Sequence, residues 1–177
     1  MPETNILPIL YVPAPELRAK ARPVADADMD QVRSLVPSML ETMYKAPGIG
    51  LAAPQIGRLL RLVVIDLQPD DQPAPLVMIN PEILEASDDL EVREEGCLSL
   101  PNQYADVARP AVIRVRWHDL EGKRQEMQAD GLLATCIQHE VDHLNGVLFV
   151  DHISALKRNM LLRRLAKELK TKSRDEA

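Results

Sequence analysis

The chain of 177 residues is long enough for one domain with a substantial hydrophobic core. Hydrophobic residues make up 46% of it and aromatic residues only 3%, so the core must be mainly aliphatic. A net charge of −6 argues against a protein whose whole surface binds nucleic acid, and two cysteines are too few for a disulfide scaffold.

The first 25 residues are rich in proline and predict an extended segment. This segment has neither the basic start of a signal peptide nor the arginine-rich composition of a transit peptide. No apolar run in the chain approaches the roughly 20 residues of a membrane span. We therefore expect a cytoplasmic protein with no membrane partner.

A first helix is expected to begin at Asp28, which can cap it, with Gln31 in the capping-box position. Apolar residues then recur along one helix face, at Val32, Leu35, Val36, Met39, Leu40 and Met43. Pro37 interrupts this pattern and should kink or break the helix, because proline removes a backbone donor. Residues 46–57, APGIGLAAPQIG, are expected to end the helix as a loop.

Strands are expected next, at residues 59–66 and 75–81, with a surface loop between them. Residues 90–101 have the pattern of a strand that leads into an irregular stretch. Residues 111–130 predict a hairpin with its turn at Glu121 and Gly122, because polar and apolar residues alternate along its first arm.

From Asp130 the pattern becomes helical and continues to Gly146, a typical C-terminal stop, and Ser154 can cap a last helix. Strands do not alternate with helices in this order. We therefore expect an α+β fold, with mainly antiparallel sheets around the central helix and further helices near each terminus. Residues 1–177 should form a single domain, with an extended segment at 1–25 and a basic helix and tail at 154–177.

The central predicted helix carries QHEVDHL (138–144), which contains the HExxH pattern. His139 and His143 are four residues apart, so they lie on one helix face and can bind one metal ion. Glu140 is rotated about 100° from His139, so it can contact a water at the ion without being a ligand. An ordinary helix with two solvent-facing histidines is the alternative. Asp142 falls off the ligand face and is expected to pair with another group, such as an arginine.

Two histidines do not complete a metal site, and three positions near or beyond them are poor third ligands. Cys136 lies about 10.5 Å along the helix from His143, too far to share an ion, and is expected to line a pocket. Phe149 stands where the pattern HExxHxxGxxH has its third histidine. Glu168, the counterpart of the downstream glutamate of other zincins, lies in the basic last helix and should be solvated.

Cys97 is the favoured third ligand, with a small buried thiol as the alternative. It lies where a strand pattern breaks, and the preceding Gly96 lets the backbone turn or approach another group closely. A Cys/His/His set leaves the fourth position open, which distinguishes a catalytic site from a structural one. A metallopeptidase with another third ligand and a metal-binding module without activity are the competing interpretations.

Three segments, GIGLAAPQ (48–55), EGCLS (95–99) and QHEVDHL (138–144), resemble the signature motifs of the peptide deformylases in order and separation. The resemblance extends from about residue 5 to residue 165. It implies a metal-dependent hydrolase that removes the formyl group from N-formylmethionyl nascent peptides and releases formate. It also implies one divalent metal ion, Fe(II) in the cell, with zinc, nickel or cobalt possible in preparations.

The same resemblance implies a role for each motif residue. The metal ligands would be Cys97, His139 and His143. Glu140 would act as general base and then acid, and Gln55 and the backbone N–H of Leu98 would stabilise the oxyanion. The residues that would align the substrate or wall the methionine pocket are Ile49, Gly50, Gly96, Leu132 and Cys136. Tyr104 stands where an arginine is common in the bacterial pattern, which affects only contacts beyond the methionine.

The C-terminal region is strongly basic. Residues 154–174 contain eight lysines or arginines and one acidic residue, a net charge of +7, while the whole chain carries −6. One interpretation is a solvated helix face. The other is docking to the ribosome through phosphate contacts, which agrees with a family that acts on nascent chains. No sequence-specific nucleic-acid binding is expected.

Overall fold

The computed structural model describes residues 4–176, which form two antiparallel sheets and three α-helices. The larger sheet has the order β1-β2-β3-β6-β7, with strands Gly50–Ala52, Leu62–Ile65, Leu76–Ala86, Val112–His118 and Arg124–Asp130. The smaller one is a two-stranded ribbon formed by Leu90–Cys97 (β4) and Leu100–Pro110 (β5). The helices are Met29–Lys45 (α1), Gly131–Leu144 (α2) and Ala155–Asp175 (α3).

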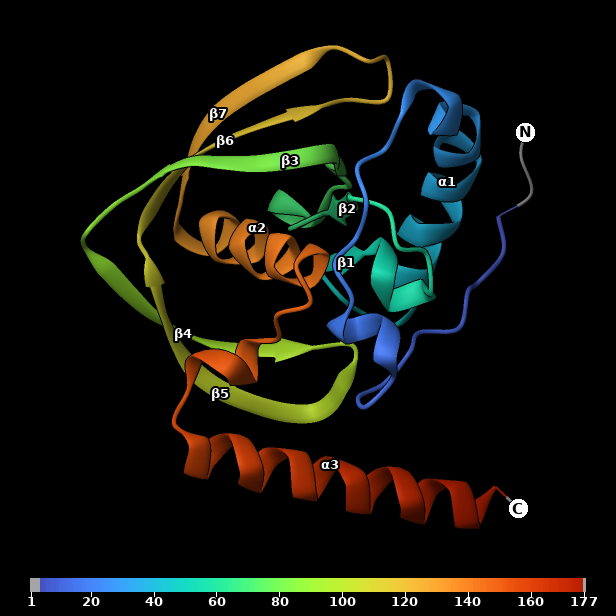
Figure 1. Ribbon diagram of the computed structural model, residues 1–177, viewed down its shortest axis with the longest axis vertical. Helices are drawn as coiled ribbons and strands as arrows, with labels where there is room; N and C mark the ends of the chain where they lie inside the picture. Colours follow the sequence, from blue (N-terminus) through green and yellow to red (C-terminus); the bar gives the residue numbers. More distant parts are fainter. Residues whose placement is uncertain (1–3, 177) are drawn as a thin grey trace.

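Helix α2 lies at the centre of the molecule, between the larger sheet and the β4–β5 ribbon (Figure 1). Helix α1 packs against β1 and β2, and α3 lies along the ribbon and contacts β5 (Figure 1). This arrangement confirms the predicted α+β fold, with antiparallel sheets around the HExxH helix. None of the helices in residues 4–176 is long and apolar enough to cross a membrane.

Strand β2 explains how both helices are held on one sheet. Its four residues, LVVI, are all buried, because the strand is covered on both faces. Side chains alternate between the faces, so Val63 and Ile65 belong to the cluster around α2. Leu62 and Val64 belong to the cluster around α1. The larger sheet therefore separates two aliphatic cores, and the core on one of its faces contains the HExxH helix α2.

The predicted first helix is confirmed, but its proposed cap and its break are not. The side chain of Asp28 does not cap α1; it accepts hydrogen bonds from Arg22 and from the backbone N–H of Ala25. Pro37 lies inside the continuous helix. The buried residues Val36 and Met39 flank it, and their packing outweighs the lost backbone hydrogen bond.

Three predictions, about one loop, one strand end and one irregular stretch, need correction. Residues 46–57 are not all loop, because they contain β1 and a 3-10 turn, Ala53–Ile56 (η3). Strand β3 does not end at Pro81 but continues to Ala86 through register shifts, which accommodate the missing N–H of the proline. The stretch after Cys97 is not irregular: β4 turns at residues 98–99 into the long strand β5.

The later elements agree with the sequence pattern. The hairpin β6–β7 turns at residues 119–123, where Gly122 has a φ of 81°. Helix α2 ends before Gly146, which has a φ of 74°, as expected for a left-handed helix stop. Ser154 caps α3 by accepting a hydrogen bond from the Lys157 N–H.

The N-terminal segment is extended as predicted apart from the 3-10 turn Pro15–Arg18, and residues 1–3 lie outside the described residues. It links two loops that are far apart in the sequence. The N–H of Leu10 donates to the Gln55 carbonyl at 2.7 Å, and the N–H of Val12 donates to the Ser99 carbonyl at 3.0 Å. The backbone of residues 10–12 therefore holds the GIGLAAPQ and EGCLS segments side by side.

Candidate active site

Three potential metal donors meet where α2 faces the end of β4. His139 and His143 lie one turn apart on α2, and Cys97 is the last residue of β4. Their ligand atoms all lie within 4.8 Å of one another, and Cys97 Sγ is 3.2 Å from His143 Nε2. One sulfur and two imidazole nitrogens are a donor set for zinc- or iron-type divalent ions, so these residues fit such an ion and leave a position open.

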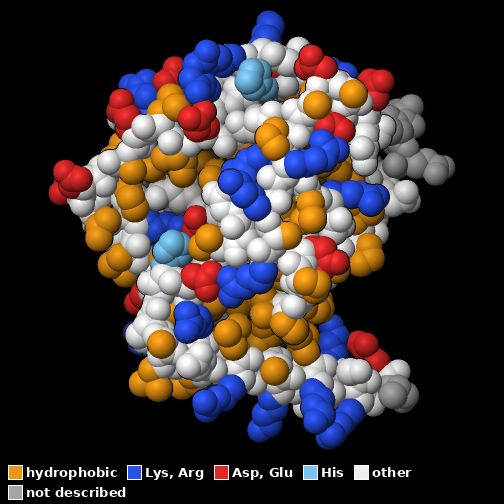
Figure 2. Space-filling view, in the orientation of Figure 1, with side chains coloured by type: hydrophobic (Ala, Val, Ile, Leu, Met, Phe, Trp, Pro, Cys, Tyr) orange, Lys and Arg blue, Asp and Glu red, His pale blue; other side chains and the backbone are white. Residues whose placement is uncertain are grey.

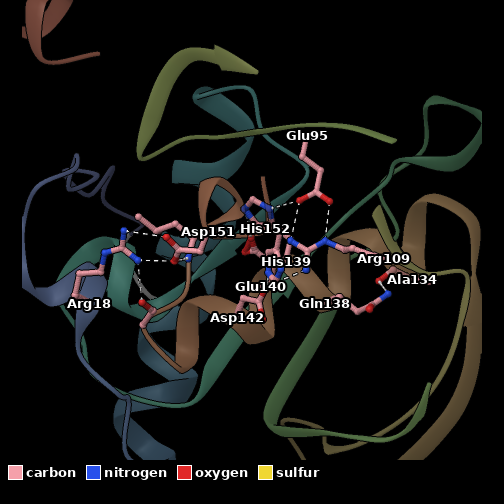
Figure 3. Close-up of polar contacts among 12 residues, drawn as sticks. Arg18, Glu95, Arg109, Ala134, Gln138, His139, Glu140, Asp142, Asp151 and His152 are labelled. Carbon is pink, nitrogen blue, oxygen red and sulfur yellow. Dashed lines mark hydrogen bonds and ion pairs between the residues drawn. The ribbon is translucent and has the colours of Figure 1, made fainter. Parts of the chain in front are cut away.

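A buried salt bridge fixes the orientation of His139. Its Nδ1 lies 3.0 Å from Glu95 Oε1, which leaves Nε2 for the metal. Arg109 donates from Nε to Glu95 at 2.7 Å and from a terminal nitrogen to Asp142 at 2.8 Å. Figure 3 shows this arginine in contact with both carboxylates, and His152 Nε2 lies 2.8 Å from the same oxygen of Asp142. The network ties the ribbon to α2 and confirms that Asp142 pairs with an arginine.

Charges in this network favour an ionised Glu95. Burial alone would raise the pKa of its carboxyl group, but hydrogen bonds from His139 and Arg109 outweigh burial and lower the pKa below its ordinary value of 4.5. The carboxylate can therefore hold the imidazole of His139 in one tautomer at neutral pH.

Glu140, unlike Glu95 and Asp142, makes no salt bridge to Arg109 among the described residues. It is 3% exposed, and its Oε2 has no hydrogen-bond partner within residues 4–176. Burial raises the pKa of Glu140 to about 7, near the range in which a carboxyl group can both accept and donate a proton at neutral pH. Its Oε1 lies 3.8 Å from His139 Nε2, so the carboxylate borders the space that the metal donors enclose.

Gln55 approaches the same space from η3. The side chain is 1% exposed, and its Oε1 accepts a hydrogen bond from the Ala52 N–H at 2.9 Å. Its Nε2 donates to Ser99 Oγ at 3.1 Å and lies 3.6 Å from Cys97 Sγ. The amide nitrogen of Gln55 is therefore the end of this side chain that faces the candidate metal site.

A cavity of about 670 Å³ opens beside these groups. The residues expected to align the substrate or wall a methionine pocket all line it, namely Ile49, Gly50, Gly96, Leu132 and Cys136. Leu98, Tyr104, Gln55, His139 and Glu140 line it as well. The ring of Tyr104 covers Gly96 so closely that a Cβ atom there would lie 2.5 Å from it, so any other residue at this position would force the ring to move.

The residues that were rejected as third ligands from the sequence take no part in the cluster of metal donors. Burial raises the pKa of the Cys136 thiol to about 12, so this residue stays protonated and lines the cavity. Phe149 is buried among apolar residues and stacks on His139 at 6.2 Å between ring centroids. The prediction of a solvated Glu168 was incomplete, because Glu168 accepts a hydrogen bond from Gln103 of β5.

The pattern reasoning gave no role to Glu95, Arg109 or Ser99. Glu95 and Arg109 are both 5% exposed, although charged residues are rarely buried unless paired. They are 14 residues apart on neighbouring strands of the ribbon, and their salt bridge runs diagonally across it, because the register of β4 and β5 sets Arg109 opposite Glu91 and Glu95 opposite Ala105. The register could not be predicted while β5 itself was missed.

Comparisons with known proteins agree with one another. A family model described as polypeptide deformylase matches residues 6–159. The chain is 56% identical over 169 residues to the peptide deformylase of Mesorhizobium japonicum, covering 95% of this chain and 96% of that protein. It is 54% identical to the peptide deformylase of Rhizobium meliloti, covering 95% of this chain and 97% of the relative.

Solved structures give the same result. A crystal structure of a peptide deformylase from Legionella pneumophila superposes with a TM-score of 0.89 at 46% identity, covering 96% of this chain and 99% of that one. A peptide deformylase from Synechococcus elongatus, in complex with actinonin, superposes with a TM-score of 0.84 at 49% identity. That match covers 89% of this chain and 86% of the other.

Proposed function

The chain belongs to the polypeptide deformylase family, and we propose that Cys97, His139 and His143 hold the divalent metal ion that this family uses. Like its family, the chain is a metal-dependent hydrolase that removes the N-terminal formyl group from nascent polypeptides and releases formate. The convergence of the three donor atoms beside a buried glutamate, whose Oε2 has no hydrogen-bond partner among the described residues, is the observation that carries the assignment.

The metal ion, when bound, supplies Lewis acidity and allows a water molecule to ionise near neutral pH. Glu140 then has the two tasks of a general base and a general acid. Its carboxylate borders the donor atoms and accepts the proton of the attacking water. It later delivers that proton to the nitrogen that leaves as the free amino terminus. Its Oε2 has no hydrogen-bond partner among the described residues, which supports this role, because this oxygen is available to accept a proton.

Two hydrogen-bond donors are proposed to stabilise the negative charge that develops on the formyl oxygen. The Nε2 group of Gln55 faces the candidate metal site, and the backbone N–H of Leu98 lies in the turn that follows Cys97. A preorganised donor of this kind typically accounts for a factor of about 10²–10³ in kcat. The substrate backbone is proposed to lie along Ile49, Gly50 and Gly96, with the methionine side chain against Leu132 and Cys136.

Fe(II) is the proposed cellular metal, with zinc, nickel or cobalt able to replace it in preparations. The mixed sulfur and nitrogen donor set accepts all four ions, so the argument for iron comes from the family resemblance. Metal analysis of protein purified without oxygen tests it. Iron at one equivalent supports the proposal, and zinc at one equivalent in such a sample contradicts it.

The full 177 residues are proposed to work as one cytoplasmic domain that docks on the ribosome through α3. Apolar residues of α3 pack on the body, with Leu161 and Leu165 buried. Its lysines and arginines project from the lower edge of the molecule in Figure 2. A basic surface of this kind can contact ribosomal phosphates without reading sequence.

The docking proposal can be tested without disturbing the core. A variant with glutamine at four exposed positions, Arg163, Arg164, Lys167 and Lys170, should lose at least about tenfold in ribosome affinity at low salt. The matched control carries the same charge change at Lys20, Lys45, Arg58 and Lys123, which are exposed on other elements. Equal cosedimentation of both variants with ribosomes would reject docking through α3.

The activity is tested directly by formate release from a formyl-Met-Ala peptide. Protein purified without oxygen is loaded with Fe(II), and Glu140→Ala serves as the control. Wild type should release formate, while the variant should keep its metal and lose turnover. Loss of metal from the variant would make Glu140 structural. No release from fully loaded wild type would contradict the proposed chemistry.

A further inference from the structure

The Gln55 carboxamide is fixed in one orientation. Its Oε1 accepts a hydrogen bond from the Ala52 N–H at 2.9 Å, and a backbone N–H can only donate to an acceptor such as this oxygen. The amide therefore cannot be flipped without breaking this bond. Its nitrogen must point the other way, toward Ser99 and Cys97.

Ser99 is placed to receive that nitrogen. Its side chain is fully buried, and its Oγ accepts a hydrogen bond from Gln55 Nε2 at 3.1 Å, across 44 positions of sequence. Within residues 4–176, this is the one hydrogen bond that the hydroxyl makes to another side chain. The backbone carbonyls of both residues are also bonded to the same N-terminal stretch, at Leu10 and Val12. The pair is thus held by contacts at both backbone and side-chain level.

The two hydrogens of a carboxamide nitrogen lie in one plane, roughly 120° apart. Ser99 receives one of them, so the second is directed to the opposite side of the nitrogen, on which Cys97 lies. Without the Ser99 oxygen, the terminal torsion of Gln55 would be restrained at the Ala52 end alone. Such terminal torsions are broad, so the second N–H would lose its fixed direction.

We propose that Ser99 is a positioning residue, which aims the second N–H of Gln55, now directed toward Cys97 Sγ, at the formyl oxygen in the transition state. The inference rests on the proposed role of Gln55. Ser99 itself contacts neither substrate nor metal in this proposal, and its hydroxyl acts through Gln55. Its loss should lower kcat by about tenfold, less than the 10²–10³ typical for loss of an oxyanion donor, because the donor stays but is misdirected.

The test is a double-mutant cycle with Ser99→Ala, Gln55→Leu and the combined variant, each loaded with Co(II) and assayed on formyl-Met-Ala. Ser99→Ala should lower kcat and leave KM unchanged, since the aimed bond forms mainly in the transition state. In the Gln55→Leu background, Ser99→Ala should have no further effect. Equal losses in both backgrounds would show that Ser99 acts independently of Gln55 and would overturn the proposal.

The Co(II) absorption spectrum separates positioning from damage to the site, because Ser99 is two residues from Cys97. Ser99→Ala should keep the visible bands and the thiolate charge-transfer band of wild type. Altered bands would mean that Ser99 supports Cys97 instead, which overturns the inference. Should the alanine variant not fold, Ser99→Gly removes the same oxygen and must meet the same two criteria. If wild type fails to release formate, the proposed function itself fails. Normal wild-type turnover with an unaffected Ser99 variant rejects this inference alone.

Discussion

Gly50 lies against the carboxyl end of Glu140: a Cβ atom at position 50 would come within 3.1 Å of both Cγ and Cδ of that side chain. This separation is tighter than ordinary van der Waals contact, and Glu140 is buried. Gly50→Ala should therefore displace the carboxylate by a few tenths of an ångström. We expect kcat to fall about tenfold or more, because small errors in the position of a catalytic group are costly.

The readout for Gly50→Ala is kcat together with metal content and the midpoint of urea unfolding. Metal content should match wild type, since the three atoms nearest to the added Cβ all belong to Glu140 and none belongs to a proposed ligand. Unchanged kcat in a metal-loaded, folded variant would show that Glu140 tolerates the displacement.

The two cysteines offer a matched pair of substitutions. Cys97→Ala should lose metal, because it removes the single sulfur donor from the cluster with His139 and His143. Cys136→Ala should keep metal, because burial raises the pKa of that thiol to about 12 and leaves it protonated. Metal content after dialysis, measured by elemental analysis, distinguishes them. Full metal occupancy in Cys97→Ala would favour a metallopeptidase-like site with another third ligand.

Glu95→Gln should weaken metal binding by about 10–100-fold, the usual effect of removing a group that orients a metal-bound histidine. The substitution neutralises the partner of His139 Nδ1 and leaves the buried Arg109 with one carboxylate fewer. Glu91→Gln is the control, since Glu91 lies on the same strand and pairs with Arg93 away from the donor atoms. Competition with a chelator gives the metal affinities of the Glu95→Gln and Glu91→Gln variants. Equal affinities would show that Glu95 does not support metal binding.

A second buried carboxylate makes stability depend on pH. Asp66 is 1% exposed and accepts hydrogen bonds from the Tyr44 hydroxyl and from the N–H groups of Gln68 and Ala74. Burial opposes these bonds, but together they lower the pKa of Asp66 below 3.8. The contribution of ionised Asp66 to the free energy of unfolding is therefore complete above the pKa that Asp66 has in the unfolded chain. It is lost as the pH falls below that value. Burial is the larger cause, and the hydrogen bond to Asp66 the second, that raises the pKa of Tyr44 from 10 to about 12. The contribution of the neutral Tyr44 hydroxyl to stability is therefore lost between pH 10 and 12.

Tyr44→Phe should lower the free energy of unfolding by about 1.5–3 kcal/mol near pH 7, the usual value of a hydrogen bond to a charged group. The difference from wild type should be widest between about pH 5 and 9 and should narrow on both sides, following the two pKa shifts. Urea unfolding at pH 4, 7 and 11 measures it. A difference that stays constant across this range would mean that the hydroxyl is not coupled to Asp66.

The sequence period predicted α2 well because its core residues and its candidate metal ligands both recur with the spacing of a helix. Ile137 and Leu144 are buried in the core, while His139 and His143 face the ribbon, so the apolar and the metal-binding patterns both read as helix. The caps of the later elements followed the same local rules, as at Ser154. Local sequence rules were sufficient to predict an element wherever residues close in the sequence determine its conformation.

The missed features depend on partners distant in sequence. Strand β5 was missed, because residues 90–101 were expected to lead into an irregular stretch and no strand was predicted over residues 102–110; its pairing with β4 supplies the order that the local pattern lacks. Strand β1 is three residues long and is defined by its register with β2. Arg109 was given no role from the sequence. Its contact with Glu95 joins two strands, because the ribbon register sets Arg109 opposite Glu91 and not opposite Glu95.

Trp117 is the chain's single tryptophan and lies 6% exposed in the cluster that joins the larger sheet to α2. Its intrinsic fluorescence therefore reports on one layer of the molecule and not on the ribbon that carries Cys97. If metal release leaves the emission maximum unchanged, the layer formed by the larger sheet and α2 stays intact when the metal leaves. A red shift that accompanies metal release means that both layers come apart together. The protein thus contains its own optical probe for whether the active site opens locally or only by global unfolding.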